Sequence, residues 1–304
     1  MIAMKVLMSG GGGFIGQMLT RYLLNRGLQV VILDRNKARM VSPQLQWFQV
    51  DLLKPNLFEK EWFSKVDAVI NLSGRDIFTF WNAEAKKAIW ESRVTVNKNL
   101  VQFISELDKK PKVFISASAV GYYGHKGDAE LDENAPRGHG FLADVCEAWE
   151  REAREAEKLG IRSVQVRTAP VLEKSGGILK QVLKSFQFGF AFTFGSGTTW
   201  FPWLHMEDLI RIYHFVVINE NISGPVNACA PYPVRFRDFI DHLIKFRKAI
   251  VIPFPIWILK MVLQETADVV LFSQKMVPTK LLRTNFQFSY SKLRGALEEI
   301  FSRR

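Results

Sequence analysis

Short apolar runs alternate with longer amphipathic stretches along the first 170 residues of this 304-residue chain. Each run has the length of one buried strand, and the stretches between them repeat apolar side chains at helical spacing. The expected strands cover residues 5–9, 29–33, 45–50, 66–72, 112–116 and 163–167, and the expected helices cover 14–25, 83–107 and 141–159. This alternation predicts an α/β fold built on a doubly wound parallel sheet with right-handed crossovers.

The pattern changes after Arg167. A stretch rich in glycine and phenylalanine at 176–197 leads to an aromatic cluster at 200–203, a helix at 207–218 and a strand near 226–228. We therefore expect two domains: residues 1–170 carry the sheet, and residues 171–304 form a smaller C-terminal substrate domain. The smaller domain would pack on the edge of the sheet and bound a cleft.

Five phenylalanines in this second half alternate strictly with other residues. They are Phe186, Phe188, Phe190, Phe192 and Phe194. Alternation with a period of two predicts one face of an extended segment. That face would wall an apolar substrate pocket or pack in the core of the second domain.

The longest apolar run extends from Ala249 to Leu263 and is interrupted by Pro253, Pro255 and Lys260. It is too short to span a bilayer. We interpret it as a docking element of the second domain, with a helix lying in a membrane surface as the alternative.

A glycine turn joins the first strand to the first helix. Gly10, Gly13 and Gly16 lie three residues apart. The turn can therefore be tight, its backbone N–H groups can approach phosphate oxygens, and the helix can pack closely on the sheet. The helix begins at Phe14 and Ile15, and its N-terminus adds roughly half a positive charge. This unit predicts a Rossmann domain that binds the pyrophosphate of a dinucleotide.

The second expected strand ends at Asp34-Arg35, where the adenosine ribose would lie. An acid there accepts hydrogen bonds from the ribose hydroxyls of NAD, whereas an adjacent arginine pairs with the 2′-phosphate of NADP. The basic side chains of Arg35, Lys37 and Arg39 favour NADP(H), because Asp34 can turn away from the ribose or bind Arg35. NAD(H) is the alternative.

Hydroxyl groups follow the fifth expected strand. Ser116 and Ser118 lie at its carboxyl end, with Tyr122 and Tyr123 just beyond. In a parallel sheet this end faces the same crevice as the glycine turn, and so does the loop at Ser73-Gly74 after the fourth strand. The alternative for Ser118 is a plain loop hydroxyl, and for the two tyrosines a pair of rings lining a loop.

Several segments, in this order, resemble the extended short-chain dehydrogenase/reductase superfamily and more narrowly its atypical YfcH-like branch, a sugar-nucleotide epimerase-like NAD(P)-binding family. The segments are the glycine turn, 71–74, 116–124, 141–150, 195–197, 203–208 and 278–300. The resemblance implies an NAD(P)-binding Rossmann domain, an adenine contact at Asp51-Leu52 and cofactor contacts at Ser73, Gly74 and Ser116. An ordinary helix cap is the alternative for Asp51.

By the same resemblance, Ser118 occupies the position of the catalytic Ser/Thr that hydrogen-bonds the reacting oxygen. The usual Tyr–Lys pair on the following helix is missing. Phe141 and Leu142 lie near the Tyr position, and Val145 and Cys146 lie near the Lys position. The nearest substitutes are two catalytic candidates, Tyr122 and Tyr123.

We therefore expect an NAD(P)-dependent oxidoreductase or epimerase that transfers hydride to or from a small, anionic or nucleotide-linked substrate. Because the Tyr–Lys pair is missing, the alternative is a non-catalytic NADP(H)-binding redox sensor or assembly partner.

The formal charge of +11 attracts anionic partners but does not choose among them. The basic residues are scattered and no nucleic-acid-reading motif accompanies them, so we expect no nucleic-acid partner. Two distant cysteines, Cys146 and Cys229, and the absence of a signal segment favour the reducing cytoplasm. No His, Cys, Asp and Glu grouping has metal-ligand spacing. The expected partner is a small-molecule substrate, without stable membrane insertion, and a homodimer is left open.

Overall fold

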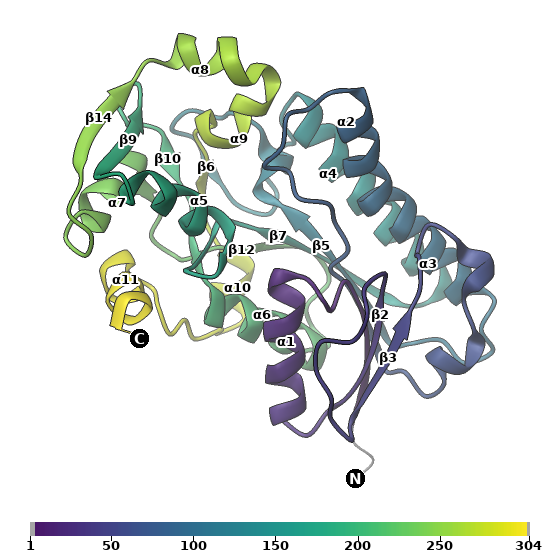
Figure 1. The fold of residues 1–304 in the computed structure, drawn as a ribbon. Coiled ribbons are helices and arrows are strands. Elements are labelled where there is room, and N and C mark those ends of the chain that lie inside the picture. Colours follow the sequence, from purple (N-terminus) through teal and green to yellow (C-terminus); the bar gives the residue numbers. More distant parts are fainter. Residues whose placement is uncertain (1–3, 303–304) are drawn as a thin grey trace.

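Seven strands form one parallel sheet in the order β12-β7-β5-β4-β1-β2-β3 (Figure 1). The computed structural model describes residues 4–302. The strands are β1 (Lys5–Ser9), β2 (Gln29–Asp34), β3 (Leu45–Gln49), β4 (Ala68–Asn71), β5 (Val113–Ala119), β7 (Arg162–Thr168) and β12 (Gly224–Ala228). The α/β fold with a doubly wound parallel sheet is confirmed, and the predicted strands differ from the observed ones by at most a few residues at their ends.

Helices cover both faces of the sheet, which explains why its central strands are almost wholly apolar. α1 (Phe14–Asn25) and α6 (Met206–Ile218) pack together over one face, and α3 (Val96–Ser105) and α4 (Phe141–Arg154) pack together over the other (Figure 1). Each face has its own apolar core. The carboxyl ends of the strands are left open toward the C-terminal part of the chain.

The helical region predicted at 83–107 is interrupted by one π-helical turn. α2 (Ala83–Trp90) runs into a π-helical segment at Glu91–Thr95, and α3 follows. Single π turns inside α-helices change the direction of the side chains that follow them, and they are frequent at functional sites. Here the turn contains Ser92 and Arg93.

The second half of the chain contributes to the sheet as well as to its own core. After α6 the chain returns as β12, which pairs in parallel with β7 from Gly224 opposite Val164 to Ala228 opposite Thr168. The division into domains 1–170 and 171–304 stays a prediction. Because β12 belongs to the second part and pairs with β7 of the first, the main sheet contains residues from both parts.

A third core lies in the C-terminal part, around the fully buried Trp203. Its helices are α5 (Gly177–Phe186), α7 (Phe236–Leu243) and α11 (Leu293–Ser302). β9 (Phe190–Phe194) pairs in parallel with β14 (Ile250–Phe254) beside them. The remaining short elements are β6 (Glu130–Leu131), β8 (Val171–Glu173), β10 (Trp200–Phe201), β11 (Leu204–His205), β13 (Val234–Arg235), β15 (Lys275–Met276), α9 (Asp268–Leu271), α10 (Thr279–Arg283) and the 3₁₀ turns 55–57, 60–63, 120–123, 155–159 and 264–267.

The predicted phenylalanine stripe is only partly extended. Phe186 ends α5 and Phe188 lies in the following turn, so only Phe190, Phe192 and Phe194 share one face of β9. Phenylalanines that alternate along the sequence can lie at the end of a helix or in a turn as well as in a strand. The prediction for Phe186 and Phe188 is therefore wrong.

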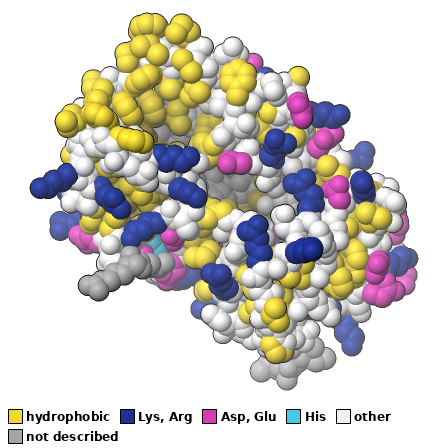
Figure 2. Space-filling model, viewed as in Figure 1, with side chains coloured by type: hydrophobic (Ala, Val, Ile, Leu, Met, Phe, Trp, Pro, Cys, Tyr) yellow, Lys and Arg dark blue, Asp and Glu magenta, His cyan; other side chains and the backbone are white. Residues whose placement is uncertain are grey.

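The apolar run at 249–263 forms β14 and then α8 (Ile256–Leu263). β14 docks on β9 as expected, but α8 has no buried residue although seven of its eight residues are apolar. Figure 2 shows hydrophobic side chains gathered over α8 and β14 at the surface. No helix among residues 4–302 combines the length and apolarity that crossing a membrane requires.

Candidate functional site

The glycine turn lies where the carboxyl end of β1 meets α1, and its shape depends on residues without side chains. Gly10 has a φ of +72°, a conformation that side chains rarely adopt. A Cβ on Gly16 would lie 2.3 Å from the Gly10 carbonyl oxygen, so only glycine lets α1 approach the turn this closely. The Gly13 N–H donates to that same oxygen at 3.0 Å. The turn is tight, as the sequence predicts.

The N-terminus of α1 is left without a protein cap. Gly13 occupies the N-cap position, no side chain among residues 4–302 caps the first turn, and that turn contains no acidic residue. Such an end presents free N–H groups and a partial positive charge to a ligand. Phe14 and Ile15, at the start of the helix, line the adjoining cavity. The arrangement fits a diphosphate.

Asp34, at the end of β2, turns its carboxylate toward the protein. Its Oδ2 accepts from the Gly12 N–H at 2.9 Å, and its Oδ1 accepts from Asn36 through the backbone N–H at 2.8 Å and the side-chain amide at 3.0 Å. A carboxylate offers about four acceptor sites, so three of them are occupied. Asp34 therefore holds the glycine turn and retains little capacity for a ribose.

A crevice of about 190 Å³ opens beside Asp34. Arg35, Asp51 and Leu52 line it, as do Ser73 and Gly74 from the loop after β4. The Arg35 side chain is exposed, and its guanidinium has no hydrogen-bond or ion-pair partner among the described residues. The crevice has the position and the lining of an adenosine site at the edge of a Rossmann sheet.

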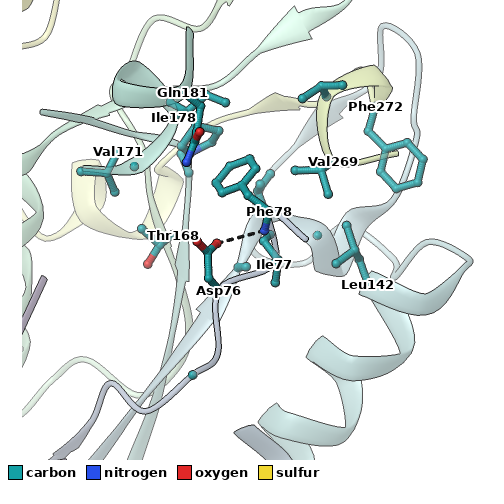
Figure 3. A pocket seen from close by; sticks show the side chains of 18 of the residues that line it. Asp76, Ile77, Phe78, Leu142, Thr168, Val171, Ile178, Gln181, Val269 and Phe272 are labelled. Carbon is teal, nitrogen blue, oxygen red and sulfur yellow. Dashed lines mark hydrogen bonds between the residues drawn. The ribbon is translucent and has the colours of Figure 1, made fainter. Parts of the chain in front are cut away.

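A larger cavity of about 870 Å³ continues from the same loop toward the C-terminal part of the chain. Both hollows are lined by Gly10, Gly13, Leu72, Ser73 and Gly74, so one elongated ligand can pass from one to the other. Figure 3 shows the far part of this cavity.

Side chains point into that far part from opposite walls. In Figure 3, Gln181 of α5 and Asp76 point toward each other across the cavity, and Phe78 lies between Ile178 and Val269. The Asp76 carboxylate accepts from the Phe78 N–H at 2.9 Å, which fixes the loop that carries Phe78.

Ser118 lines the larger cavity and is oriented by a buried ion pair. Its hydroxyl donates to Glu150 Oε1 at 2.7 Å. Glu150 accepts from Arg167 at both oxygens, from Nε and from Nη2 at 2.8 Å each. All three side chains are at most 3 % exposed. Because the Ser118 proton goes to the carboxylate, the Ser118 oxygen presents its lone pairs to the cavity.

Arg167 connects this pair to the two tyrosines that the sequence indicates. Its guanidinium lies 3.5 Å from the centre of the Tyr122 ring and donates to the Tyr123 hydroxyl at 3.0 Å. Burial lowers the pKa of Arg167, but the hydrogen bonds and the charge of Glu150 raise it above its ordinary value. Arg167 therefore stays protonated and paired with Glu150 beneath Ser118.

Tyr123 is fully buried and its hydroxyl is already engaged. It contacts the Asp132 carbonyl oxygen at 2.9 Å and the Asn227 side-chain oxygen at 2.6 Å. Burial raises the pKa of Tyr123, and also that of Tyr122. Neither tyrosine lines either hollow. This placement does not favour proton transfer to a ligand by either residue.

Ser116 lies deeper in the same strand than Ser118. Its hydroxyl accepts from the Asn97 side chain at 2.8 Å and donates to the Ala117 carbonyl at 2.8 Å, and Ser116 is fully buried. Asn97 also holds Asn71 at 2.6 Å, next to Ser73. Ser116 lines neither hollow. It supports the strand ends from below and is not exposed to a cofactor.

Apolar side chains stand where a Tyr–Lys pair would project from α4. Leu142, Val145 and Cys146 line the cavity. Phe141 packs instead against Trp81, with ring centroids 5.2 Å apart. Burial raises the pKa of the Cys146 thiol to about 12, so the thiol is not a proton carrier near neutrality. The missing pair has no direct replacement on this helix.

Two further residues, Arg93 and Tyr213, line the cavity, and of these Tyr213 carries no signal in the sequence. Arg93 of the π-helical turn lines the cavity and donates from Nη2 to the Arg75 carbonyl at 2.9 Å, and burial lowers its pKa to about 10. Tyr213 also lines the cavity, and its buried hydroxyl has no hydrogen-bond partner among residues 4–302. Only the packing of α6 against the strand ends turns Tyr213 toward the cavity.

A metal site is absent from the described part of the chain: no group of three His, Cys, Asp or Glu side chains there could hold an ion. Both cysteines are free and buried. The chemistry of the cavity is therefore that of Ser118, its ion pair and whatever the glycine turn binds.

Comparison with known sequences identifies two matching families. The NAD dependent epimerase/dehydratase family matches residues 6–229, and a domain of unknown function, DUF1731, matches residues 254–300. The chain is 35 % identical over 305 residues to the chloroplastic epimerase family protein SDR39U1 homolog of Arabidopsis thaliana, covering 98 % of this chain and 86 % of the relative. It is 32 % identical to the epimerase family protein YfhF of Bacillus subtilis, covering 99 % of both chains.

Comparison with solved structures agrees. The human epimerase family protein SDR39U1, solved with NADPH, has a TM-score of 0.87 and 29 % identity, covering 99 % of this chain and 100 % of that one. A nucleoside-diphosphate sugar epimerase of Corynebacterium glutamicum has a TM-score of 0.79 and 31 % identity, covering 98 % of this chain and 58 % of that one. A structure of MoeE5 with UDP-glucuronic acid and NAD, at 16 % identity, shares the fold. These relatives do not favour a non-catalytic protein.

Proposed function

Because the chain belongs to the NAD dependent epimerase/dehydratase family, we propose that it is an NADP(H)-dependent oxidoreductase or epimerase of the atypical short-chain dehydrogenase/reductase type. The glycine turn carries the proposal: its N–H groups and the uncapped start of α1 face the junction of the two hollows. Gly10, Gly13, Phe14, Ile15 and Gly16 would hold the diphosphate. When bound, the nicotinamide would supply or accept the hydride.

The preference for NADP(H) rests on the opposite roles of two neighbouring residues. The Asp34 carboxylate accepts hydrogen bonds from Gly12 and Asn36. The Arg35 guanidinium has no partner among the described residues and lies beside the adenosine crevice. Arginine binds phosphate through charge-assisted, paired hydrogen bonds. The human relative was solved with NADPH, which supports the same choice. Asp51, Leu52, Ser73 and Gly74 would complete the adenosine site.

Ser118 would position the reacting oxygen of the substrate. Its proton is committed to Glu150, so its oxygen is ready to accept a hydrogen bond from a substrate hydroxyl. Binding of a carbonyl requires the Ser118 proton to leave Glu150. The arrangement thus favours binding of the alcohol form of the substrate in the resting protein. The proton that is transferred during the reaction would then be exchanged with water or with the substrate itself.

Cofactor titration tests the proposal. NADPH and NADH are added separately to the purified protein and binding is followed by tryptophan fluorescence. We expect tighter binding of NADPH, and an Arg35→Ala change that weakens NADPH binding at least ~10-fold while altering NADH binding less than about 2-fold. Arg39→Ala is the matched control, because Arg39 lines neither hollow. Binding of neither nucleotide refutes the proposal, and tighter binding of NADH refutes the NADP preference.

A further inference from the structure

The larger cavity extends well past Ser118, and the character of its far walls indicates what the substrate is. We propose that this part of the cavity takes an uncharged, largely apolar molecule with a single carbonyl or hydroxyl group, and not a nucleotide-linked sugar. This inference rests on the proposed function, because it assigns the cofactor to the glycine turn and leaves only the far part for the substrate.

Charged side chains are few and unevenly placed around the cavity. Among the described lining residues they are Arg75, Asp76, Arg93 and Asp268. Both arginines belong to the segments that follow β4, at the cofactor end. A Cβ on Gly74 would lie 3.1 Å from the Arg93 guanidinium carbon, and Gly74 also lines the adenosine crevice. The cations are therefore next to the cofactor site.

The wall built from residue 168 onward contains no described lysine or arginine. Its only charged lining residue among residues 4–302 is Asp268, and Asp76 points into the far part from the opposite wall; both are carboxylates, which would repel a phosphate. A diphosphate buried in low-dielectric surroundings needs cations or several N–H donors to replace its lost hydration. The far wall supplies no cation for this purpose, so a nucleotide-linked sugar would lose more on desolvation than it could regain.

Apolar side chains make up most of the same wall. Phe192 of β9 and Phe254 of β14 meet nearly at right angles, with ring centroids 5.9 Å apart, and both line the cavity. Leu259 of α8 adds to this side. Val269, Phe272 and Leu142, all labelled in Figure 3, line the cavity as well. An apolar ligand gains from leaving water here, whereas a sugar would leave its hydroxyl groups unpaired.

Uncharged polar side chains are interspersed among the apolar ones and can orient a functional group of the ligand. Gln181 points into the cavity from α5 in Figure 3, and the buried Tyr213 hydroxyl lacks a partner among the described residues. Ser118 lies at the cofactor end. Pockets for small apolar ligands combine a few such groups with hydrophobic walls in this manner.

A probe of each kind tests the inference. The wild-type protein is saturated with NADP⁺, and saturation is checked by calorimetry. It is then titrated with N-phenyl-1-naphthylamine, an uncharged apolar molecule whose fluorescence rises in apolar surroundings, and separately with UDP-glucose. We expect the naphthylamine to bind at least ~100-fold more tightly than UDP-glucose.

Two variants of one strand localise the binding. Phe192→Lys places a charge in the cavity wall, whereas Phe190→Lys places the same charge on the same face of β9, at a residue that is 40 % exposed and does not line the cavity. We expect Phe192→Lys to weaken naphthylamine binding at least ~10-fold and Phe190→Lys to change it less than about 2-fold, with NADP⁺ binding unchanged in both.

The outcomes separate this inference from the proposed function. Failure of NADP⁺ to bind refutes the proposed function. If NADP⁺ still binds, three results refute only the apolar substrate. They are UDP-glucose binding as tight as that of the naphthylamine, no binding of the naphthylamine, and equal effects of Phe192→Lys and Phe190→Lys.

A second observation, independent of the cavity, concerns the outer surface of α8. Trp257, Met261 and Val262 are 68 %, 67 % and 59 % exposed, and Ile250 of β14 is 67 % exposed. A helix that is apolar on all sides is ordinarily buried, and large exposed apolar patches mark interaction sites. We propose that this surface, the α8 patch, docks on a membrane surface that contains anionic lipids.

Charge around the α8 patch identifies the occupant. Between Leu243 and Gln264 the chain has four basic residues and no acidic one, and Glu265, which follows directly, is paired with Lys86. The basic residues are Lys245, Arg247, Lys248 and Lys260, all exposed and without a salt bridge among the described residues. Exposed tryptophan and aliphatic side chains flanked by lysine and arginine are typical of segments that lie in the interface of anionic membranes.

Vesicle sedimentation tests this second inference. Full-length protein is mixed with vesicles of phosphatidylcholine alone or with phosphatidylglycerol added. We expect binding only to the anionic vesicles, weakened by salt and reduced at least ~10-fold by Trp257→Ser. Tyr232→Ser is the matched control, since Tyr232 is 60 % exposed outside the α8 patch. Absence of vesicle binding, equal effects of the two changes, or a dimer in ultracentrifugation that Trp257→Ser dissociates would overturn it.

Discussion

The Ser118 hydroxyl donates a 2.7 Å hydrogen bond to Glu150, a fully buried carboxylate that Arg167 holds at both oxygens. This relationship fixes the direction of the Ser118 proton, which in turn fixes what the Ser118 oxygen offers to the cavity. A charge-assisted bond of this kind is stronger than one between neutral groups. The geometry therefore fixes the orientation of the Ser118 hydroxyl.

Ser118→Ala should lower turnover about 100-fold or more, because the reacting oxygen loses its positioning partner. The Kd for NADPH should change less than about 2-fold, since Ser118 does not line the adenosine crevice. Measurement of kcat, KM and cofactor Kd on one preparation checks this. Unchanged turnover with any accepted substrate would remove Ser118 from the mechanism.

Glu150→Ala should destabilise the protein by about 3–5 kcal/mol, because it leaves the buried Arg167 guanidinium without its carboxylate. Glu147→Ala on the same helix is the control. The Glu147 side chain is 29 % exposed and pairs with Arg154 at 3.1 Å, so its loss should cost under about 1 kcal/mol. Urea denaturation measures both free energies of unfolding. Equal losses would mean that the buried pair contributes no more than a surface one.

Gly16→Ala should weaken NADPH binding at least ~10-fold, because the added Cβ would lie 2.3 Å from the Gly10 carbonyl oxygen and force α1 away from the turn. Gly295→Ala in α11 meets no atom within 4 Å and should stabilise its helix by about 0.5–1 kcal/mol. Calorimetric titration and thermal unfolding of both variants check this. NADPH affinity that Gly16→Ala leaves intact would contradict the role of close helix approach.

Alkylation of Cys146 should be slow at neutral pH and rise steadily with pH. Only the thiolate reacts, and burial raises the pKa of Cys146 to about 12, so roughly one thiol in ten thousand is ionised at pH 8. The rate should therefore increase about tenfold per pH unit from pH 7 to pH 10. Mass spectrometry of the labelled peptide follows it. A rate that levels off before pH 10 would show an ordinary or lowered pKa.

Much of the fold follows from short-range patterns. The strands β1 and β2 contain apolar runs of the right length, and the glycine turn is specified by three residues within one segment. β12 could not be placed in this way, because its pairing with β7 joins residues 60 positions apart, Gly224 and Val164. Sequence patterns predict whether an element is a helix or a strand more readily than they predict which strand it pairs with.

The candidate site shows the same limit. Ser116 and Ser118 are two residues apart and share one face of β5, but Ser118 reaches the cavity whereas Ser116 stays one strand repeat deeper, bonded to Asn97. Tyr123 lies in a single 3₁₀ turn, and of its partners Asp132 is 9 residues away in the chain and Asn227 is 104 residues away. The local sequence does not specify how far along a strand a residue reaches toward the cavity, or in which direction a side chain points from a single turn.

The most direct test of the central claim is an experimental structure of the protein soaked with NADPH. The account predicts the diphosphate against the N–H groups of Phe14 and Ile15, the adenosine between Arg35 and Leu52, and the Arg35 guanidinium within hydrogen-bond distance of the 2′-phosphate. An empty crevice beside Gly13 at saturating NADPH, or nucleotide bound elsewhere on the molecule, would contradict it.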